Sequence, residues 1–234
     1  MRSIKDKIHK IGIEMMKNHP RYHDTVFDPK RGIVPRCLIY EDENRNLSRR
    51  GSVIVGINPG QSNEPEREFY KKTGASYPAT ITYWDDRIKK LRYYVHGRAF
   101  VDALKLRGPI LWTELVKCES QPGIRELSVQ TIRDSINRYL FKELEAIPGD
   151  WLLIAVGGEA FKILSYHFPD RIVIGIPHIT SARGQFHKLF SKNVINPIAK
   201  QQLKKLLRDN KLVATAFKCR NGDCRFDYPQ TYSK

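Results

Sequence analysis

SVIVGINPG, residues 52–60, is an apolar, β-branched run that ends in Asn-Pro-Gly. A run of this kind before turn residues is typical of a buried strand followed by a loop. Three similar runs follow: ILWTELV (110–116), LLIAVG (152–157) and IVIGI (172–176). Helical patterns alternate with them at 87–106, 128–146 and 158–168. This alternation predicts an α/β fold, a three-layer α/β/α sandwich with a central four-stranded parallel sheet.

The flanking segments extend this core. Residues 3–18 have apolar side chains at helical spacing after a capping Ser3, and residues 195–209 form a basic helical pattern. Residues 19–50 are polar and proline-containing, which predicts an irregular segment with a short strand near 37–40. Residues 61–86 predict a long functional loop or a broken helix. We therefore expect one domain over 1–234, with an N-terminal extension (1–50) and a C-terminal hairpin tail (211–234).

The charge balance points to a polyanionic partner. The 234 residues include 41 Lys and Arg against 25 Asp and Glu, a formal net charge of +16. This excess favours nucleic acid over a basic surface that serves solubility alone. No apolar run is long enough to span a membrane, and MRSIKDKIHKIG lacks the apolar core of a secretory signal. We expect an intracellular protein without a membrane partner.

Four cysteines occur, and only Cys219 and Cys224 lie close together in sequence. Their segment CRNGDC has Asn-Gly at its centre, which predicts a tight hairpin that places the two cysteines opposite each other. They could form a disulfide or supply two of four zinc ligands, but no second pair has ligand spacing. In a reducing cytosol we expect two free thiols. The sequence predicts no metal and no cofactor.

Two residues follow predicted strands, where ligands of open α/β sheets bind. Asn58 lies in the Asn-Pro-Gly loop, where an amide can hold a water or a base and backbone N–H groups can approach a ligand. His178 follows Pro177 after the fourth run and can donate a hydrogen bond to a developing anion while neutral. A simple turn and a surface histidine remain the alternatives.

Four segments in order carry a resemblance to a known family: GINPGQSN (56–63), ILWTELVKC (110–118), LLIAVGGEAFKIL (152–164) and IPHITSARGQFHKLFSKN (176–193). Together they resemble the uracil-DNA glycosylase superfamily over about residues 50–210. The first motif is most similar to that of the mismatch-specific uracil and thymine glycosylases, where GINPG occurs. The resemblance implies hydrolysis of the N-glycosidic bond of a flipped uracil, or another deaminated or mismatched base, in base excision repair.

The resemblance also implies residue roles. Asn58 would position the attacking water, and His178 would donate to the leaving base. The base-binding residues carried over from the family are Gly56, Ile57, Gln61, Ser62, Phe69, Tyr70 and Glu114. Among them, the backbone at Gln61 and Ser62 would hold the base or a flanking phosphate, and Phe69 or Tyr70 would stack on the base. The DNA-binding residues are Ser181, Arg183 and Gly184.

This sequence departs from the family pattern at three places. Glu114 stands where many members have an asparagine that recognises uracil. An ionised Glu114 would disfavour uracil and a protonated one would accept it, unless Glu114 is a surface residue. The HITSARG loop lacks the usual wedge leucine, for which Ile179 or Arg183 could substitute. Cys118 matches one ligand of the iron–sulfur branch without its partners, so we expect a buried thiol and no cluster.

Three functions remain open at this point. The first is a monofunctional DNA glycosylase that acts as a monomer on double- or single-stranded DNA. The second is a catalytically weak or inactive DNA-binding protein on the same fold. The third is an RNA- or nucleotide-binding protein on an unrelated α/β fold. In the first two, we expect six basic residues to contact phosphates: Lys89, Lys90, Arg92, Lys204, Lys205 and Arg208.

Overall fold

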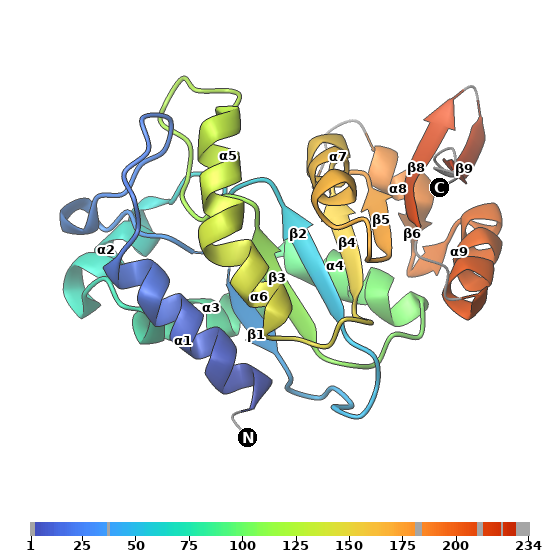
Figure 1. Ribbon diagram of the computed structural model, residues 1–234, viewed down its shortest axis with the longest axis horizontal. Helices are drawn as coiled ribbons and strands as arrows, with labels where there is room; N and C mark the ends of the chain where they lie inside the picture. The colour runs from blue at the N-terminus through green and yellow to red at the C-terminus, as the bar shows by residue number, and fades with distance from the viewer. Residues whose placement is uncertain (1–2, 37, 181–183, 210–212, 221, 228–234) are drawn as a thin grey trace. The chain divides into compact units, whose positions relative to one another are not determined.

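A seven-stranded, mostly parallel sheet lies at the centre of the computed structural model, in the order β1-β3-β2-β4-β5-β8-β9 (Figure 1). The structure describes residues 3–36, 38–180, 184–209, 213–220 and 222–227. All four predicted strands are present: β2 (Ser52–Gly56), β3 (Ile110–Glu114), β4 (Leu152–Val156) and β5 (Val173–Ile176). The expected count of four was too small, because β1 (Ile39–Glu41), β8 (Ala214–Arg220) and β9 (Asp223–Asp227) join the same sheet.

Strand pairing explains why the central strands are so apolar. β2 pairs in parallel with β4 from Ser52↔Leu152 onward, β4 with β5, and β5 with β8. Every residue of β2, β3 and β4 is buried. Interior parallel strands are covered on both faces, so their sequences are continuously apolar instead of alternating.

The chain, expected to form one domain, divides by its contacts into two compact units. The first comprises Met1–Tyr40, Ile57–Lys89 and Trp112–Gly149, and the second Glu41–Gly56, Lys90–Leu111 and Asp150–Lys234. The loop that follows β2 therefore begins the second segment of the first unit.

Helices of the first unit are α1 (Ile4–Lys17), α2 (Glu64–Thr73), α3 (Tyr77–Lys90, whose last residue lies in the second unit), α5 (Val129–Ser135) and α6 (Phe141–Glu145). A π-helical turn, Ile136–Leu140, joins α5 to α6, and a 3-10 turn spans Pro29–Arg31. The predicted cap is confirmed, since Ser3 and Asp6 form a reciprocal capping box at α1. Residues 61–86 form a broken helix, in which Gly74 ends α2 with φ of 85°.

Helices of the second unit are α4 (Arg92–Ala103), α7 (Gly158–His167), α8 (Gln185–Leu189) and α9 (Pro197–Asp209), with a small hairpin of β6 (Phe190–Ser191) and β7 (Val194–Ile195). The basic helix α9 lies beside β9 in Figure 1. Its Gln202 side chain bonds both the N–H (2.8 Å) and the carbonyl (3.2 Å) of Phe226. One half-buried amide thus joins α9 to the outer strand of the sheet.

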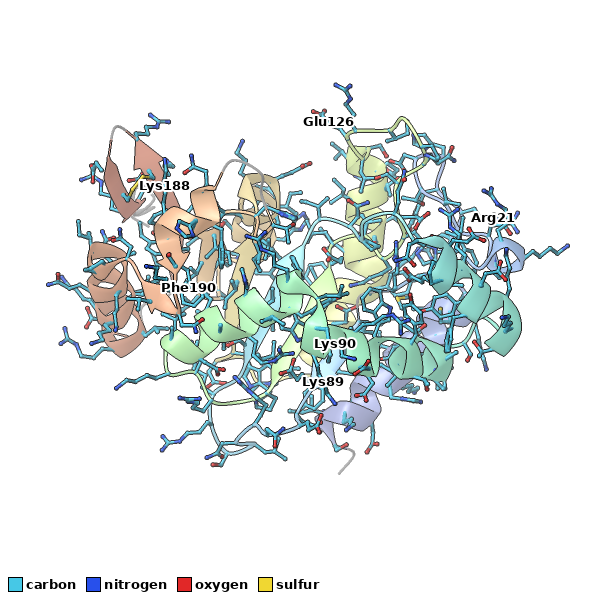
Figure 2. All side chains as sticks on the ribbon, turned by 180° about the vertical axis from the view of Figure 1, so that it is seen from behind. Arg21, Lys89, Lys90, Glu126, Lys188 and Phe190 are labelled. Carbon is cyan, nitrogen blue, oxygen red and sulfur yellow. A yellow bond between two sulfur atoms is a disulfide. The ribbon has the colours of Figure 1, made fainter. Side chains whose placement is uncertain are left out.

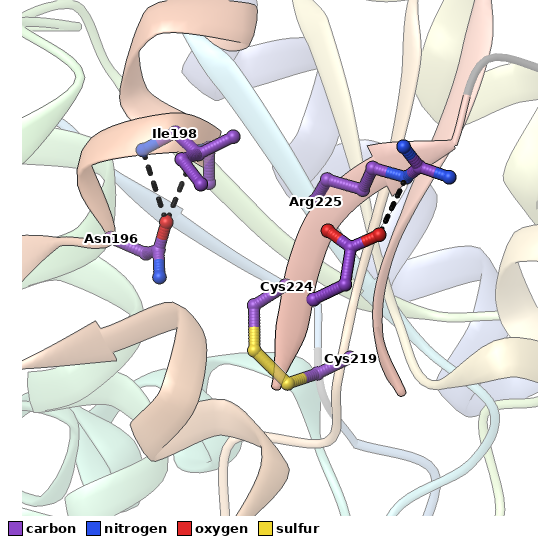
Figure 3. The surroundings of a disulfide bond; sticks show 7 residues. Asn196, Ile198, Cys219, Cys224 and Arg225 are labelled. Atoms are coloured by element: carbon purple, nitrogen blue, oxygen red, sulfur yellow. Dashed lines mark hydrogen bonds and ion pairs between the residues drawn. A yellow bond between two sulfur atoms is a disulfide. The ribbon is translucent and has the colours of Figure 1, made fainter. Parts of the chain in front are cut away.

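The predicted hairpin is confirmed in β8 and β9, where Cys219 lies directly opposite Cys224. The two cysteines form a disulfide (Figure 3), so the expectation of free thiols was wrong for this structure. The antiparallel register brings their side chains together on one face, as the Asn-Gly turn predicts. On the outer strand β9, Arg225 lies 3.4 Å from Asp223 and 3.7 Å from Asp227, so this edge is charged.

Within the described ranges, no helix combines the length and apolarity that a membrane crossing requires. Among the same residues, no group of three or more His, Cys, Asp and Glu side chains is arranged to hold a metal ion.

Candidate active site

The loop after β2 is fixed at three backbone groups. The carbonyl of Ile57 accepts a hydrogen bond from the N–H of Val116 at 2.8 Å. The carbonyl of Gly60 accepts from the guanidinium of Arg36, and the N–H of Ser62 donates to the Glu119 carboxylate at 2.6 Å. These bonds hold the loop in one conformation before any ligand arrives.

Arg36 is the centre of a buried ionic cluster. Its guanidinium donates to Glu66 at 2.7 Å and to Glu119 at 2.8 Å. All three side chains are almost fully buried, and burial raises the pKa of Glu66 above its usual value. Loss of one partner from such a cluster leaves an uncompensated buried charge. The geometry of the loop therefore depends on three residues that the sequence analysis did not select.

Asn58 is half-buried and oriented by one side-chain bond. Its amide nitrogen donates to the hydroxyl of Ser120 at 3.0 Å. In the described part of the chain, no residue donates a hydrogen bond to its carbonyl oxygen. That oxygen can accept from a water, which an amide positions well but deprotonates poorly.

The other predicted base-binding residues near this loop differ in exposure. Gly56 is the buried last residue of β2, Ile57 is half-buried and Gln61 is exposed. Ser62 is buried, with its N–H on Glu119 and its hydroxyl accepting from Arg67 at 2.9 Å. A role for the Ser62 amide in holding a base or phosphate therefore requires the bond to Glu119 to be replaced, whereas Gln61 is accessible.

The two candidate stacking residues lie together on α2. Tyr70 is 1% exposed and packs in the core, with its ring centroid 5.5 Å from that of Phe69 and 5.6 Å from that of Tyr83. Burial raises the pKa of its hydroxyl. Phe69 is half-buried, 5.0 Å from Tyr83, and keeps exposed ring surface. Of the two, Phe69 is the accessible one.

Glu114, the last residue of β3, is 7% exposed, so it is not the surface glutamate that the sequence allowed. Its Oε2 is buried without a hydrogen-bond partner in the described residues. Burial raises the pKa of Glu114 to about 8, although Lys117 and Arg36 act in the opposite direction. Near neutral pH the group is mostly a protonated acid, with one O–H donor and acceptor capacity.

Lys117 does not neutralise Glu114 because it is committed elsewhere. Its ammonium, fully buried, lies 2.8 Å from the Glu143 carboxylate and 2.6 Å from the hydroxyl of Thr113. It also donates to the backbone carbonyl of Glu114 at 2.6 Å. Among the described residues, the carboxyl of Glu114 therefore has no ion-pair partner within contact distance.

Cys118 is a free, fully buried thiol, as expected. Its sulfur lies 3.6 Å from Nε2 of His19, whose pKa is lowered to about 4 by burial. Burial also raises the pKa of the Cys118 thiol. Both groups are therefore neutral and belong to the packing of the first unit.

His178 lies in the second unit, two residues beyond β5, and is exposed. Partial desolvation lowers its pKa, so the ring is neutral at physiological pH. Its Nδ1 lies 3.2 Å from the hydroxyl of Thr180. When that hydroxyl donates, the ring proton is on Nε2, which is the tautomer that can donate to a leaving base.

The predicted DNA-binding loop is described in part. Ser181 and Arg183 lie outside the described residues. Gly184 precedes α8 with φ of 64°, a left-handed conformation that glycine adopts without strain. Ile179 is 2% exposed, so as a buried core residue it is not available as the wedge.

A hollow of about 390 Å³ lies at the carboxyl ends of β4, β5 and β8 in the second unit. Its lining includes Pro177, the residue before His178, together with Phe161, Phe217, Lys218 and Arg220. Lys218 is paired with Asp227 at 2.8 Å. None of these side chains was predicted as a site residue; Phe217, Lys218 and Arg220 belong to β8, which was expected to form a tail outside the sheet.

A scan against protein-family models finds no match to this chain, and a search of curated proteins finds none either. The resemblance therefore rests on the four short motifs and on the chemistry of the residues within them.

Proposed function

We propose that the protein is a monofunctional DNA glycosylase that hydrolyses the N-glycosidic bond of a flipped, deaminated or mismatched base. One observation supports this proposal above the others. Asn58 is anchored through its amide nitrogen, with its carbonyl oxygen available, on a loop fixed by buried charges. That arrangement suits the positioning of a water by a group that is not itself a strong base.

In the proposed reaction, the glycosidic bond breaks towards an oxocarbenium-like sugar, and the base leaves with the bonding electron pair. A water held by the Asn58 carbonyl oxygen adds to the sugar C1′ and loses its proton to solvent. His178 donates a hydrogen bond from Nε2 to the carbonyl oxygen of the departing base, on which negative charge develops. Two neutral side chains thus act at the two ends of the breaking bond, Asn58 at the sugar and His178 at the departing base.

Glu114 is the proposed contact with the edge of the base. As a protonated acid it can donate to a 4-oxo group and still accept from a ring N–H. The group then performs the task of the amide found at this position in the family. Uracil remains an acceptable substrate while Glu114 is protonated, and is disfavoured once it ionises.

DNA is the proposed partner because of the charge of +16, which favours phosphate contacts. The six basic residues expected to contribute are all exposed. Figure 2 labels two of them, Lys89 and Lys90. Each phosphate neutralised adds about 0.9 to the magnitude of the slope of log binding constant against log salt. A binding constant that hardly changes with salt would contradict this part of the proposal.

The deciding experiment is an excision assay on matched oligonucleotides. Duplex and single strands carrying uracil, hypoxanthine, xanthine or a T·G mismatch are incubated with enzyme in excess, then cleaved at abasic sites with alkali. We expect cleavage by wild type and a large loss in Asn58→Ala. DNA binding without cleavage of any substrate would favour the catalytically inactive DNA-binding protein instead.

A further inference from the structure

A second hollow, of about 700 Å³, lies in the first unit and has no part in the proposed reaction. Its lining includes Arg21, Tyr22, Phe27, Asp28, Lys30 and Gln121. Two aromatic rings, two cations and one primary amide therefore border a single space, whose volume is within the ~300–1,000 Å³ of small-ligand sites.

The wall of this hollow is held in place from behind. The hydroxyl of Tyr22 donates to Asp134 at 2.6 Å. The rings of Tyr22 and Phe27 lie 5.7 Å and 5.6 Å from that of His19, as centroid distances. Both aromatic side chains are only half-buried, so each keeps accessible ring surface. The two rings are thus held in position and remain partly exposed to solvent.

The same wall reaches Asn58 through residues 119–121. The N–H of Val26 donates to the carbonyl of Glu119 at 2.9 Å. Thr25 forms an antiparallel bridge with Ser120, whose hydroxyl holds the Asn58 amide. Gln121, the next residue, lines the hollow itself. One short backbone segment therefore orients Asn58 and borders the hollow.

The cations and aromatic rings of the lining indicate which kind of ligand the hollow can bind. Arg21 and Lys30 are exposed, and Figure 2 shows the Arg21 side chain on the outside of the chain. Asp28, the one acid among the described residues that line the hollow, accepts from the N–H of Arg31 and caps the 3-10 turn. Cations for phosphates together with aromatic faces for bases are the combination that binds single-stranded nucleic acid.

We infer that this hollow binds a nucleotide that neighbours the excised one in the same DNA strand. The inference rests on the proposed function for the identity of that strand. The base would stack on Tyr22 or Phe27, its phosphates would lie against Arg21 and Lys30, and Gln121 would face the edge of the base.

Photo-cross-linking tests the inference without any dependence on catalysis. 5-Iodouracil is placed one or two positions to either side of the target, in strands that carry either uracil or an unmodified cytosine as the target. Trypsin cleaves after Arg21 and Lys30, so one peptide, residues 22–30, contains both rings. We expect a cross-link to this peptide from one side of the target only. Cross-links that map solely to other peptides, or equally from all positions, would overturn the inference.

Variants separate stacking from charge. Phe27→Leu keeps an apolar side chain but removes a ring face, and should weaken single-strand binding roughly five-fold or more. Tyr22→Phe keeps the ring and loses only the bond to Asp134, so its cross-link should persist. The double variant Arg21→Gln, Lys30→Gln should reduce the salt slope by ~1.4–1.8, at ~0.7–0.9 per cation. Lys10→Gln, an exposed cation on α1 outside the lining, should leave the cross-link unchanged.

Failure of the inference and failure of the proposed function give different results. Excision of a base without a cross-link to residues 22–30 would reject the hollow as a nucleotide site and leave the glycosylase proposal intact. A cross-link to residues 22–30 without excision would support the hollow as a DNA site and reject the glycosylase.

Discussion

The surroundings of Asn58 and of His178 differ in how firmly each side chain is held. Around Asn58, buried ions and backbone bonds fix the loop, and the side chain donates to Ser120 at 3.0 Å. His178 is exposed, and the one side-chain hydrogen bond found for it in the described residues is that with Thr180. A water must be placed accurately, whereas a histidine that follows a departing base benefits from a neutral ring more than from a rigid one. The difference predicts separate effects on stability and on rate.

The largest expected effect is on the stability of the protein when the buried cluster beside the Asn58 loop is disrupted. Arg36→Met leaves Glu66 as a buried charge without its partner and leaves Glu119 with only the longer pair to Arg67 at 3.7 Å, so it should lower the free energy of unfolding by about 3–5 kcal/mol. Urea denaturation followed by circular dichroism measures it. Lys71→Met is the control, because it removes only exposed pairs, with Glu68 at 2.6 Å and Glu64 at 3.9 Å, and each such pair contributes less than about 1 kcal/mol. Equal losses in the two variants would contradict the importance of the buried cluster.

The next effect is on rate alone. His178→Ala should raise the barrier to base excision by about 2–4 kcal/mol, the usual cost of losing one donor to a developing anion. Stability should hardly change, because the side chain is exposed. Single-turnover excision gives the rate, and His167→Ala, at a half-buried histidine at the end of α7 with no role in the proposed reaction, is the control. An unchanged excision rate in His178→Ala would remove this residue from the mechanism.

The buried carboxyl of Glu114 makes the stability of the protein depend on pH. Its pKa is raised from 4.5 to about 8, so the folded protein holds a proton that the unfolded chain releases. The stabilising contribution is complete below about pH 4.5 and is lost as the pH rises towards 8. Glu114→Gln should therefore gain about 2 kcal/mol over wild type between pH 6 and pH 8, at ~1.4 kcal/mol per unit.

The same substitution tests base recognition. Uracil excision by wild type should fall above pH 8 as Glu114 ionises, while Glu114→Gln, which keeps a donor and an acceptor, should remain flat. Melting temperatures and single-turnover rates over pH 5 to 9 measure both effects. Parallel pH profiles of the two proteins would mean that Glu114 does not contact the base.

The smallest expected effect compares two single hydroxyl partners. Ser120→Ala removes the bond to the Asn58 amide. It should raise the barrier to excision by about 1 kcal/mol, the usual value of one neutral hydrogen bond. Thr180→Val, which removes the partner of His178, should cost no more than this, since an exposed ring can find water instead. A larger loss of excision rate in Thr180→Val than in Ser120→Ala would contradict the conclusion that Asn58 is held more firmly than His178.

Periodicity and turn chemistry were sufficient to locate local structure. The strand that precedes the Asn58 loop, the strand that ends at Glu114, the capping by Ser3 and the hairpin of Cys219 and Cys224 were all predicted from short stretches. Entry of β8 into the sheet was not predicted, because it depends on pairing between Val173 and Ala214, 41 positions along the chain.

The buried cluster could not be found in the same way. Arg36, Glu66 and Glu119 come from three distant segments, and charged residues are ordinarily exposed. The only local signal was the apolar surroundings of Arg36 in IVPRCLIY, residues 33–40. Glu114 remained ambiguous because a strand end is compatible with either burial or exposure, and only the packing of the folded chain decides between them.

The charged outer strand β9 affects how the protein behaves at high concentration. A sheet edge offers unpaired N–H and C=O groups, which can recruit the edge of another molecule and begin aggregation. On β9 the side chains of Asp223, Arg225 and Asp227 alternate in sign along the strand, and a second copy in the same register would meet them in competition with their own ion pairs. Charge at this edge thus discourages self-association of the protein at high concentration.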